Sequence, residues 1–348
     1  MAWDETRLEA LRARYRDASG AAIHDPRFRE IADLAYREGD IREAPFAGMP
    51  TLLDAPARAT GPAAARAAGL DVALYGMPVD LAVTNRPGAR FGPRAVRGVE
   101  RIGPYNEVLD CAPTLEMKVA DIGDVPFRSR FDLHKSHADI TAFVADVLAA
   151  GAVPVGVGGD HSVSHPVLRA VGAKAPVGLI HIDAHCDTGG SYEGERFHHG
   201  GPFRNAVLDG VLDPTRTIQI GIRGSAAYAW EFSADSGMTV VTARDLASQG
   251  VERVIALARE VAGSGPTYLS FDVDSLDPAF APGTGTPEVG GLTSREALAL
   301  LRGLKGLHIV GGDVVEVAPS YDPTTNTALV AAQMLFEIVS LIQKGRRA

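Results

Sequence analysis

Short apolar runs of strand length alternate with stretches of helical period from about residue 70 to the end of the chain. Each run leads into a Gly- or Asp-containing turn and then a helical pattern, which indicates strands buried on both faces. Eight strands are predicted, at 71–76, 118–123, 152–157, 177–182, 217–221, 238–241, 267–271 and 307–310. The helices between them include 137–148, 162–171, 251–261, 294–301 and 327–342. We therefore expect an α/β fold, a three-layer α/β/α sandwich with a mostly parallel sheet of about eight strands.

The first 65 residues carry a different pattern. Charged residues are dense up to about residue 40, and residues 5–16 and 27–37 show helix-like spacing of Leu, Ile and Ala. Residues 54–69 are rich in Ala, Pro and Gly, a composition typical of a connector. We predict an N-terminal helical extension and linker over residues 1–65 and one main domain over residues 66–348.

Composition and charge narrow the class of protein. The chain has 348 residues, 46% of them hydrophobic and 22% charged, as in ordinary globular proteins. A net charge of −9 argues against a nucleic-acid partner, because phosphate binding needs concentrated positive charge. Two cysteines, Cys111 and Cys186, are too few for a disulfide framework. We see no export signal or membrane span, and we expect a cytoplasmic protein with no membrane partner.

Histidines and carboxylates gather after three of the predicted strands. Six of the ten histidines lie within residues 161–199. The segments 158–162, 183–187 and 272–274 each follow a strand, and the carboxyl ends of parallel strands meet at one edge of a sheet. Six side chains of the kinds that bind metals share these segments: His161, Asp183, His185, Asp187, Asp272 and Asp274.

The spacing within these segments predicts a metal site. Residues at alternate positions of an extended chain project to the same side, so Asp183, His185 and Asp187 share one face, as do Asp272 and Asp274. A single Asp at a strand end usually caps a helix or forms a turn, but capping does not explain three such segments. Four clustered carboxylates would repel one another unless cations neutralise them. Imidazole and carboxylate donors without thiolates suit manganese, nickel or zinc, and two divalent ions would balance the charge.

The same segments resemble the signature blocks of the ureohydrolases, the arginase and agmatinase family. The similar runs are GGDHS at 158–162, HIDAHCD at 181–187 and SFDVDSLDPAFAPGTGTPEVGG at 270–291. The resemblance covers about residues 70–343. The run at 76–97 is more similar to the agmatinase, guanidinobutyrase and guanidinopropionase branch than to arginase itself.

The resemblance implies a binuclear centre that hydrolyses a guanidino compound to urea and an amine. One ion would be held by His161, Asp183, Asp187 and Asp272. The second would be held by Asp183, His185, Asp272 and Asp274. Manganese is the metal that the resemblance implies, with nickel as the alternative. A hydroxide that bridges the two ions would attack the guanidinium carbon.

The resemblance also implies the remaining catalytic residues. Glu288 matches the carboxylate that holds the guanidinium through charge-assisted hydrogen bonds. His199 matches the histidine that shuttles a proton to the leaving amine, although His198 directly precedes it. Asp187 would in addition accept a hydrogen bond from the bridging hydroxide. We expect His181 to support the ligands and Cys186 to serve in packing.

The substrate beyond its guanidino group stays open. Glu193 and Glu195 would attract the ammonium of agmatine, whereas Arg196, Arg204 or Arg90 would pair with the carboxylate of a guanidino acid. A small guanidine, an alkylated guanidine or a biguanide is the third possibility. The loop after residue 187 lacks the asparagine that arginase places there, which disfavours arginine.

Two other functions and the state of assembly are also open. One alternative is hydrolysis of a formimidoyl group on the same fold, and another is a non-catalytic partner subunit of an active paralogue. The resemblance implies a homo-oligomer, a trimer or hexamer, and a hetero-oligomer with a paralogue is the alternative.

Overall fold

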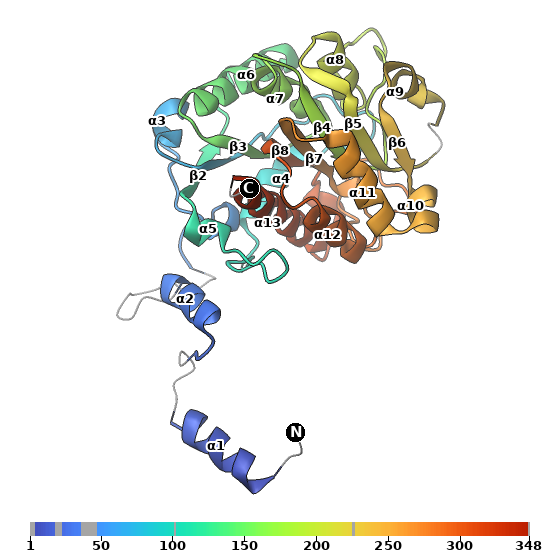
Figure 1. Ribbon diagram of the computed structural model, residues 1–348. Coiled ribbons are helices and arrows are strands. Elements are labelled where there is room, and N and C mark those ends of the chain that lie inside the picture. The colour runs from blue at the N-terminus through green and yellow to red at the C-terminus, as the bar shows by residue number, and fades with distance from the viewer. Residues whose placement is uncertain (1–3, 18–22, 36–46, 101, 225–226, 347–348) are drawn as a thin grey trace. The chain divides into compact units, whose positions relative to one another are not determined.

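The computed structural model describes residues 4–17, 23–35, 47–100, 102–224 and 227–346 (Figure 1). Its contacts divide the chain into two compact units, residues 1–44 and residues 45–348. The first unit holds α1 (Glu5–Tyr15) and α2 (Pro26–Ala35), close to the two helices predicted there. Residues 36 and 37 of the second predicted helix lie outside the described residues.

The second unit is built on one sheet of eight strands, all of whose pairings are parallel. The strands run in the order β2-β1-β3-β8-β7-β4-β5-β6. Their bounds are β1 (Val72–Gly76), β2 (Val119–Asp124), β3 (Val153–Val157), β4 (Val177–Ile182), β5 (Leu212–Ile222), β6 (Thr239–Thr242), β7 (Thr267–Asp272) and β8 (Ile309–Val315). The predicted fold class is confirmed.

Helices cover both faces of this sheet, and each face has its own hydrophobic core (Figure 1). One core contains buried side chains of α3 (Ala63–Ala67), α6 (Leu133–Ala149), α7 (Ser164–Val171) and α8 (Pro202–Leu208). The other contains buried side chains of α4 (Gly92–Arg97), α10 (Ala243–Gln249), α11 (Val251–Ala262), α12 (Ser294–Gly303) and α13 (Asn326–Arg346). Two cores on either side of one sheet make the three layers. Two further short helices, α5 (Pro113–Glu116) and α9 (Glu231–Ser236), complete the unit.

One described helix, α13, is long and apolar enough to cross a membrane, with a mean hydropathy of 1.3 in its most apolar window. The protein buries 78% of that window. The helix packs against α12 and β8. Its apolar side chains therefore fill the core on one face of the sheet, which is the usual reason for a helix that is hydrophobic all round.

Strand β8 continues five residues beyond its predicted end. Gly311 and Gly312 resemble a turn in sequence. In the structure they lie inside the strand, where a Cβ on Gly312 would be 2.8 Å from the Leu269 carbonyl oxygen of β7. Glycine here permits the close approach of two backbones. The extra length carries Asp313 into the sheet and places Glu316 directly after the strand.

The connector before β1 belongs to the second unit. Leu52 and Leu53 are buried in the same core as α13. The Arg58 amide donates to the Asp121 carbonyl, and the Leu52 amide donates to the Asp121 carboxylate. The division between the units at residues 44 and 45 therefore lies about twenty residues before the predicted boundary. The small side chains of residues 54–69 hide this packing in the sequence.

Truncation of Leu52 tests whether the connector is part of the main domain. Leu52 is fully buried, so we expect Leu52→Ala to lower the free energy of unfolding of that domain by about 2–5 kcal/mol in a denaturant titration. Leu11 of α1 is 39% exposed and serves as the control. Leu11→Ala should change the free energy of unfolding of the main domain by less than about 0.5 kcal/mol. Equal, small effects would show that residues 47–70 are a loose linker.

Candidate metal centre

Four neighbouring strands, β3, β8, β7 and β4, end at the candidate site. His161 begins the short helix after β3, and the chain reaches it through Gly158 and Gly159. A Cβ on Gly159 would lie 1.6 Å from the Val79 carbonyl oxygen, so only glycine fits this approach. Asp183 follows β4, and Asp272 is the last residue of β7. The topology thus brings together segments that are far apart in the sequence.

The first group of ligand atoms surrounds the imidazole of His161. Its Nδ1 lies 3.0 Å from Asp183 Oδ2, 2.9 Å from Asp187 Oδ2 and 3.2 Å from Asp272 Oδ2. All four side chains are buried. Asp187 has a left-handed backbone, with φ +51°, and a non-glycine residue holds this conformation at a cost. The residue with this strained backbone is therefore the one whose carboxylate contacts His161.

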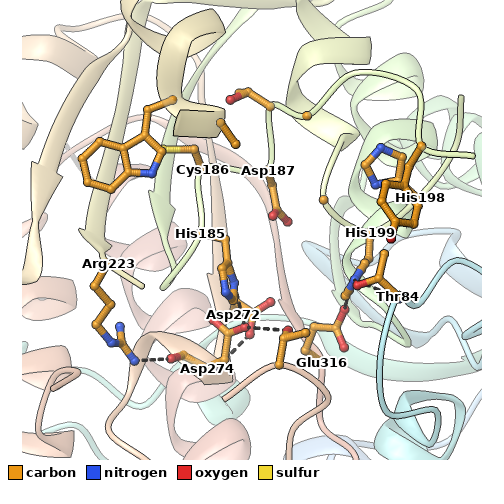
Figure 2. Close-up of a pocket in the computed structure, with 17 residues that line it drawn as sticks. Thr84, His185, Cys186, Asp187, His198, His199, Arg223, Asp272, Asp274 and Glu316 are labelled. Carbon is orange, nitrogen blue, oxygen red and sulfur yellow. Dashed lines mark hydrogen bonds and ion pairs between the residues drawn. The ribbon is translucent and has the colours of Figure 1, made fainter. Parts of the chain in front are cut away.

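The second group surrounds His185, and Asp183 belongs to both. His185 Nδ1 lies 3.1 Å from Asp274 Oδ2 and 3.5 Å from Asp183 Oδ1. Asp183 therefore directs Oδ2 at His161 and Oδ1 at His185. This is the arrangement expected of a carboxylate that bridges two ions. All six predicted ligands lie in one cluster, and four of them, His185, Asp187, Asp272 and Asp274, line a cavity (Figure 2).

Without an ion, the charge of this cluster is balanced only by bound protons, because burial lowers the pKa of His161 and of His185 but the carboxylates raise both above the ordinary value. Burial, Asp274 and Asp183 raise the pKa of Asp272 well above its ordinary value. Burial and Asp183 raise the pKa of Asp274 to about 6. His161 Nδ1 is buried and makes no hydrogen bond, although three carboxylate oxygens lie within 3.2 Å of it. Closely spaced oxygen and nitrogen donors with an unused lone pair fit a divalent cation.

The hydrogen bonds behind His161 orient it as a ligand. Ser270 Oγ donates to Asp313 Oδ1 at 2.6 Å, because a carboxylate can only accept. The same oxygen must then accept from His161 Nε2 at 2.8 Å. The proton of the neutral imidazole therefore resides on Nε2, and the lone pair of Nδ1 faces the three carboxylates. Asp313 also accepts from Tyr268 and Ser164.

His181 supports Asp183 through a second relay, by the same reasoning. The amide nitrogen of Gln219 must face the Cys186 carbonyl oxygen, because that oxygen can only accept. The same nitrogen lies 3.1 Å from His181 Nδ1, which therefore accepts. His181 Nε2 then donates to Asp183 Oδ2 at 2.7 Å. His181 lies close enough to be a ligand itself, but its proton faces Asp183, which agrees with the predicted supporting role.

Glu316, which the sequence analysis missed, pairs with His199. His199 Nδ1 donates to Glu316 Oε1 at 2.9 Å, and His199 Nε2 lies 2.7 Å from Thr84 Oγ1. Burial lowers the pKa of His199, but Glu316 raises it to a net value of about 9. Glu316 also accepts from the His161 amide, and its own backbone is left-handed, with φ +64°. Its other oxygen, Oε2, is buried at the cavity and has no partner.

The other predicted site residues lie around this cavity, whose volume is about 300 Å³. His198 Nε2 donates to the Gly190 carbonyl, away from Glu316. Glu288 lies at the rim, 32% exposed, with Oε1 3.9 Å from His185 Nε2. Cys186 contributes to the cavity wall, and burial raises the pKa of its thiol to about 12. A thiol that stays neutral fits the predicted packing role.

Comparisons with known proteins point to one family. The model of the arginase family matches residues 70–340. The chain is 49% identical to the guanidinopropionase of Pseudomonas aeruginosa, over 88% of this chain and 96% of that protein. It is 46% identical to the mitochondrial agmatinase of Gallus gallus, over 81% and 84%. The solved structure of proclavaminate amidino hydrolase from Streptomyces clavuligerus matches with a TM-score of 0.82 at 36% identity, over 87% of this chain and all of that one.

Two substitutions of His181 separate a supporting residue from a ligand. His181→Leu removes the donor to Asp183, and we expect the dissociation constant for a divalent ion to rise roughly 10- to 100-fold. His181→Gln keeps a donor close to the position of Nε2 and should change it less than about threefold. Titration calorimetry gives affinity and stoichiometry together. Loss of one bound ion in both variants would mean that His181 is a ligand.

Proposed function

The chain belongs to the arginase family, and from this premise we propose that it hydrolyses the C–N bond of a guanidino compound to urea and an amine. The observation that carries the proposal is the unpartnered oxygen of Glu316. It is a buried anion in a cavity beside the His and Asp cluster. A guanidinium group, planar and rich in N–H donors, complements such an anion.

The metals are part of this proposal. His161, Asp183, Asp187 and Asp272 would hold one divalent ion. Asp183, His185, Asp272 and Asp274 would hold the other, with manganese first and nickel as the alternative. When bound, such ions would polarise a substrate and lower the pKa of a water molecule to about 7.

Glu316 is the better placed of two candidate anchors for the guanidinium. It lines the cavity, and its Oε1 is already fixed by His199 and the His161 amide, which leaves Oε2 for the substrate. Glu288, the anchor that the sequence resemblance implied, lies at the rim beside His185. A fixed carboxylate loses less conformational freedom when it binds than an exposed one.

His199 is the proposed proton donor to the leaving amine. With a pKa of about 9 the imidazole holds a proton at neutral pH and loses it as the pH rises through that value. Its Nδ1–H donates to Glu316, and its Nε2 accepts from the Thr84 amide at 3.1 Å, so Nε2 can carry the transferred proton only after the ring turns away from that amide. His198, whose ring faces Gly190, is less well placed.

Two alternatives use the same fold. Formimidoyl-group hydrolysis would need the same cluster, and it would release formamide instead of urea. A non-catalytic partner subunit would have no need of four buried carboxylates that repel one another without ions. Two further parts of the proposal are a homo-oligomer, a trimer or hexamer, which the resemblance suggests, and a cytoplasmic location, which the low cysteine count suggests.

Urea release tests the reaction directly. We expect the protein loaded with manganese or nickel to release urea from at least one compound in a panel of agmatine, 3-guanidinopropionate, 4-guanidinobutyrate, guanidine and alkylguanidines. Formamide from formiminoglutamate would support the alternative reaction. No product from any compound, with two ions bound, would contradict the proposal.

Paired substitutions then identify the anchor. Glu316→Gln keeps the shape but removes the charge, and we expect kcat/KM to fall roughly 10- to 150-fold, because a hydrogen bond to a charged group contributes about 1.5–3 kcal/mol. The alkaline limb of the pH profile should move to lower pH, since Glu316 is what raises the His199 pKa. Glu288→Gln should change kcat/KM less than threefold. The opposite ranking would assign the anchor to Glu288.

A further inference from the structure

The acidic and basic side chains that line the cavity belong to the metal cluster, to the pair of His199 and Glu316, to Arg223 and to His198. The rest of the lining includes an outer wall formed by Cys186, Thr188, Gly189, Tyr192, Ala229 and Trp230, together with His198, whose Nε2 donates to the Gly190 carbonyl oxygen. Apart from His198, these residues have no acidic or basic side chain, and Cys186 is a buried thiol. A substrate whose guanidinium lies on Glu316 would place its substituent against this wall.

Arg223 is the one arginine among the described residues that line the cavity, and its donors are already taken. Nη2 donates to the carbonyl oxygens of Asp274 and Glu288, each at 2.7 Å. Nη1 donates to Gly221 and Ser275, and Nε to Glu288 and Val289. Figure 2 shows the guanidinium directed at Asp274 and away from the cavity centre. Arg223 therefore connects the end of β5 to the segments around Asp274 and Glu288. It has no donor left for a substrate carboxylate.

The arginines that the sequence offered for a carboxylate tail are placed elsewhere. Arg196 donates to Asn205 and Asp209, at 2.8 Å in each case. Arg90 forms an ion pair with Asp80. Arg204 lies over the ring of Phe232, 4.8 Å from its centre, and is not part of the cavity wall. Of these three, Arg204 alone stays a candidate, and only for a tail that leaves the cavity.

The acidic residues that the sequence offered for an ammonium tail are also outside the cavity wall. Glu195 accepts from the Phe197 amide and lies 3.5 Å from His134 Nε2. Glu193 is exposed. Glu288 lies 3.9 Å from His185 Nε2 and is not among the described residues that line the cavity. A cationic tail against the outer wall would therefore lack a carboxylate.

A charged tail would lose water there without gaining a partner of opposite charge, which is unfavourable, whereas an alkyl tail would gain from burial against Trp230 and Tyr192. We propose that the substrate is a guanidine with a short uncharged alkyl substituent. This inference rests on the proposed function. Water adds to the guanidinium carbon, the bond to the alkylated nitrogen breaks, that nitrogen takes a proton, and urea and an alkylamine leave.

A matched series of substrates tests the tail. We would compare kcat/KM for methyl-, N,N-dimethyl- and propylguanidine with agmatine, 3-guanidinopropionate and 4-guanidinobutyrate, using metal-loaded protein and measured urea. The inference expects at least one alkylguanidine to exceed every charged compound tenfold or more. Any other ranking among compounds that release urea overturns it. Absence of urea from all of them, and from guanidine, is instead the failure of the proposed function.

Two variants locate the effect. Trp230→Ala should lower kcat/KM for propylguanidine at least tenfold but for unsubstituted guanidine less than threefold, since guanidine has no tail to reach the wall. Arg204→Met is the control and should leave propylguanidine turnover within twofold. Equal losses for propylguanidine and guanidine in Trp230→Ala, or a loss of propylguanidine turnover in Arg204→Met, would contradict the assignment of the tail to this wall.

Discussion

The site depends on one electrostatic constraint, the burial of four carboxylates at the carboxyl ends of two adjacent strands, β4 and β7. Asp183, Asp187, Asp272 and Asp274 are all buried, and their neighbours raise the pKa of Asp272 and Asp274. Buried anions at such short distances are stable only when opposite charge lies among them. Neutral imidazole ligands bring no charge of their own, so divalent ions would supply the positive charge that the cluster needs.

The surrounding fold holds this cluster in place through side chains whose hydrogen bonds fix their orientation. The Asp313 and Ser270 relay sets the tautomer of His161, and the Gln219 and His181 relay fixes a carboxylate that both groups share. Left-handed backbones at Asp187 and Glu316 aim two more carboxylates at the cavity. Strain of this kind persists where the surrounding structure over-determines it, and here it lies at the proposed reacting centre.

The sequence was most informative about features that follow from the periodic spacing of its side chains, namely the strands and the residues at their ends. All eight strands and the six metal-type residues were predictable, because alternation and strand ends fix where those side chains point. Glu316 was not predictable, because the glycines of β8 resemble a turn and hide both the length of the strand and the residue after it. The relays of Gln219 and Asp313 were also invisible, since they join residues from different strands. The connector was misleading for another reason, as small side chains pack against β2 without any periodic signal.

Anomalous diffraction from crystals grown with manganese tests the central claim most directly. The account predicts two peaks at the manganese edge, one among His161, Asp187 and Asp272 and one between His185 and Asp274, with Asp183 between them. Two-metal sites place their ions about 3.5–4 Å apart, and the peaks should show that spacing. A single peak, or none within the cluster at saturating metal, would contradict it, because the buried carboxylates would then need another source of positive charge.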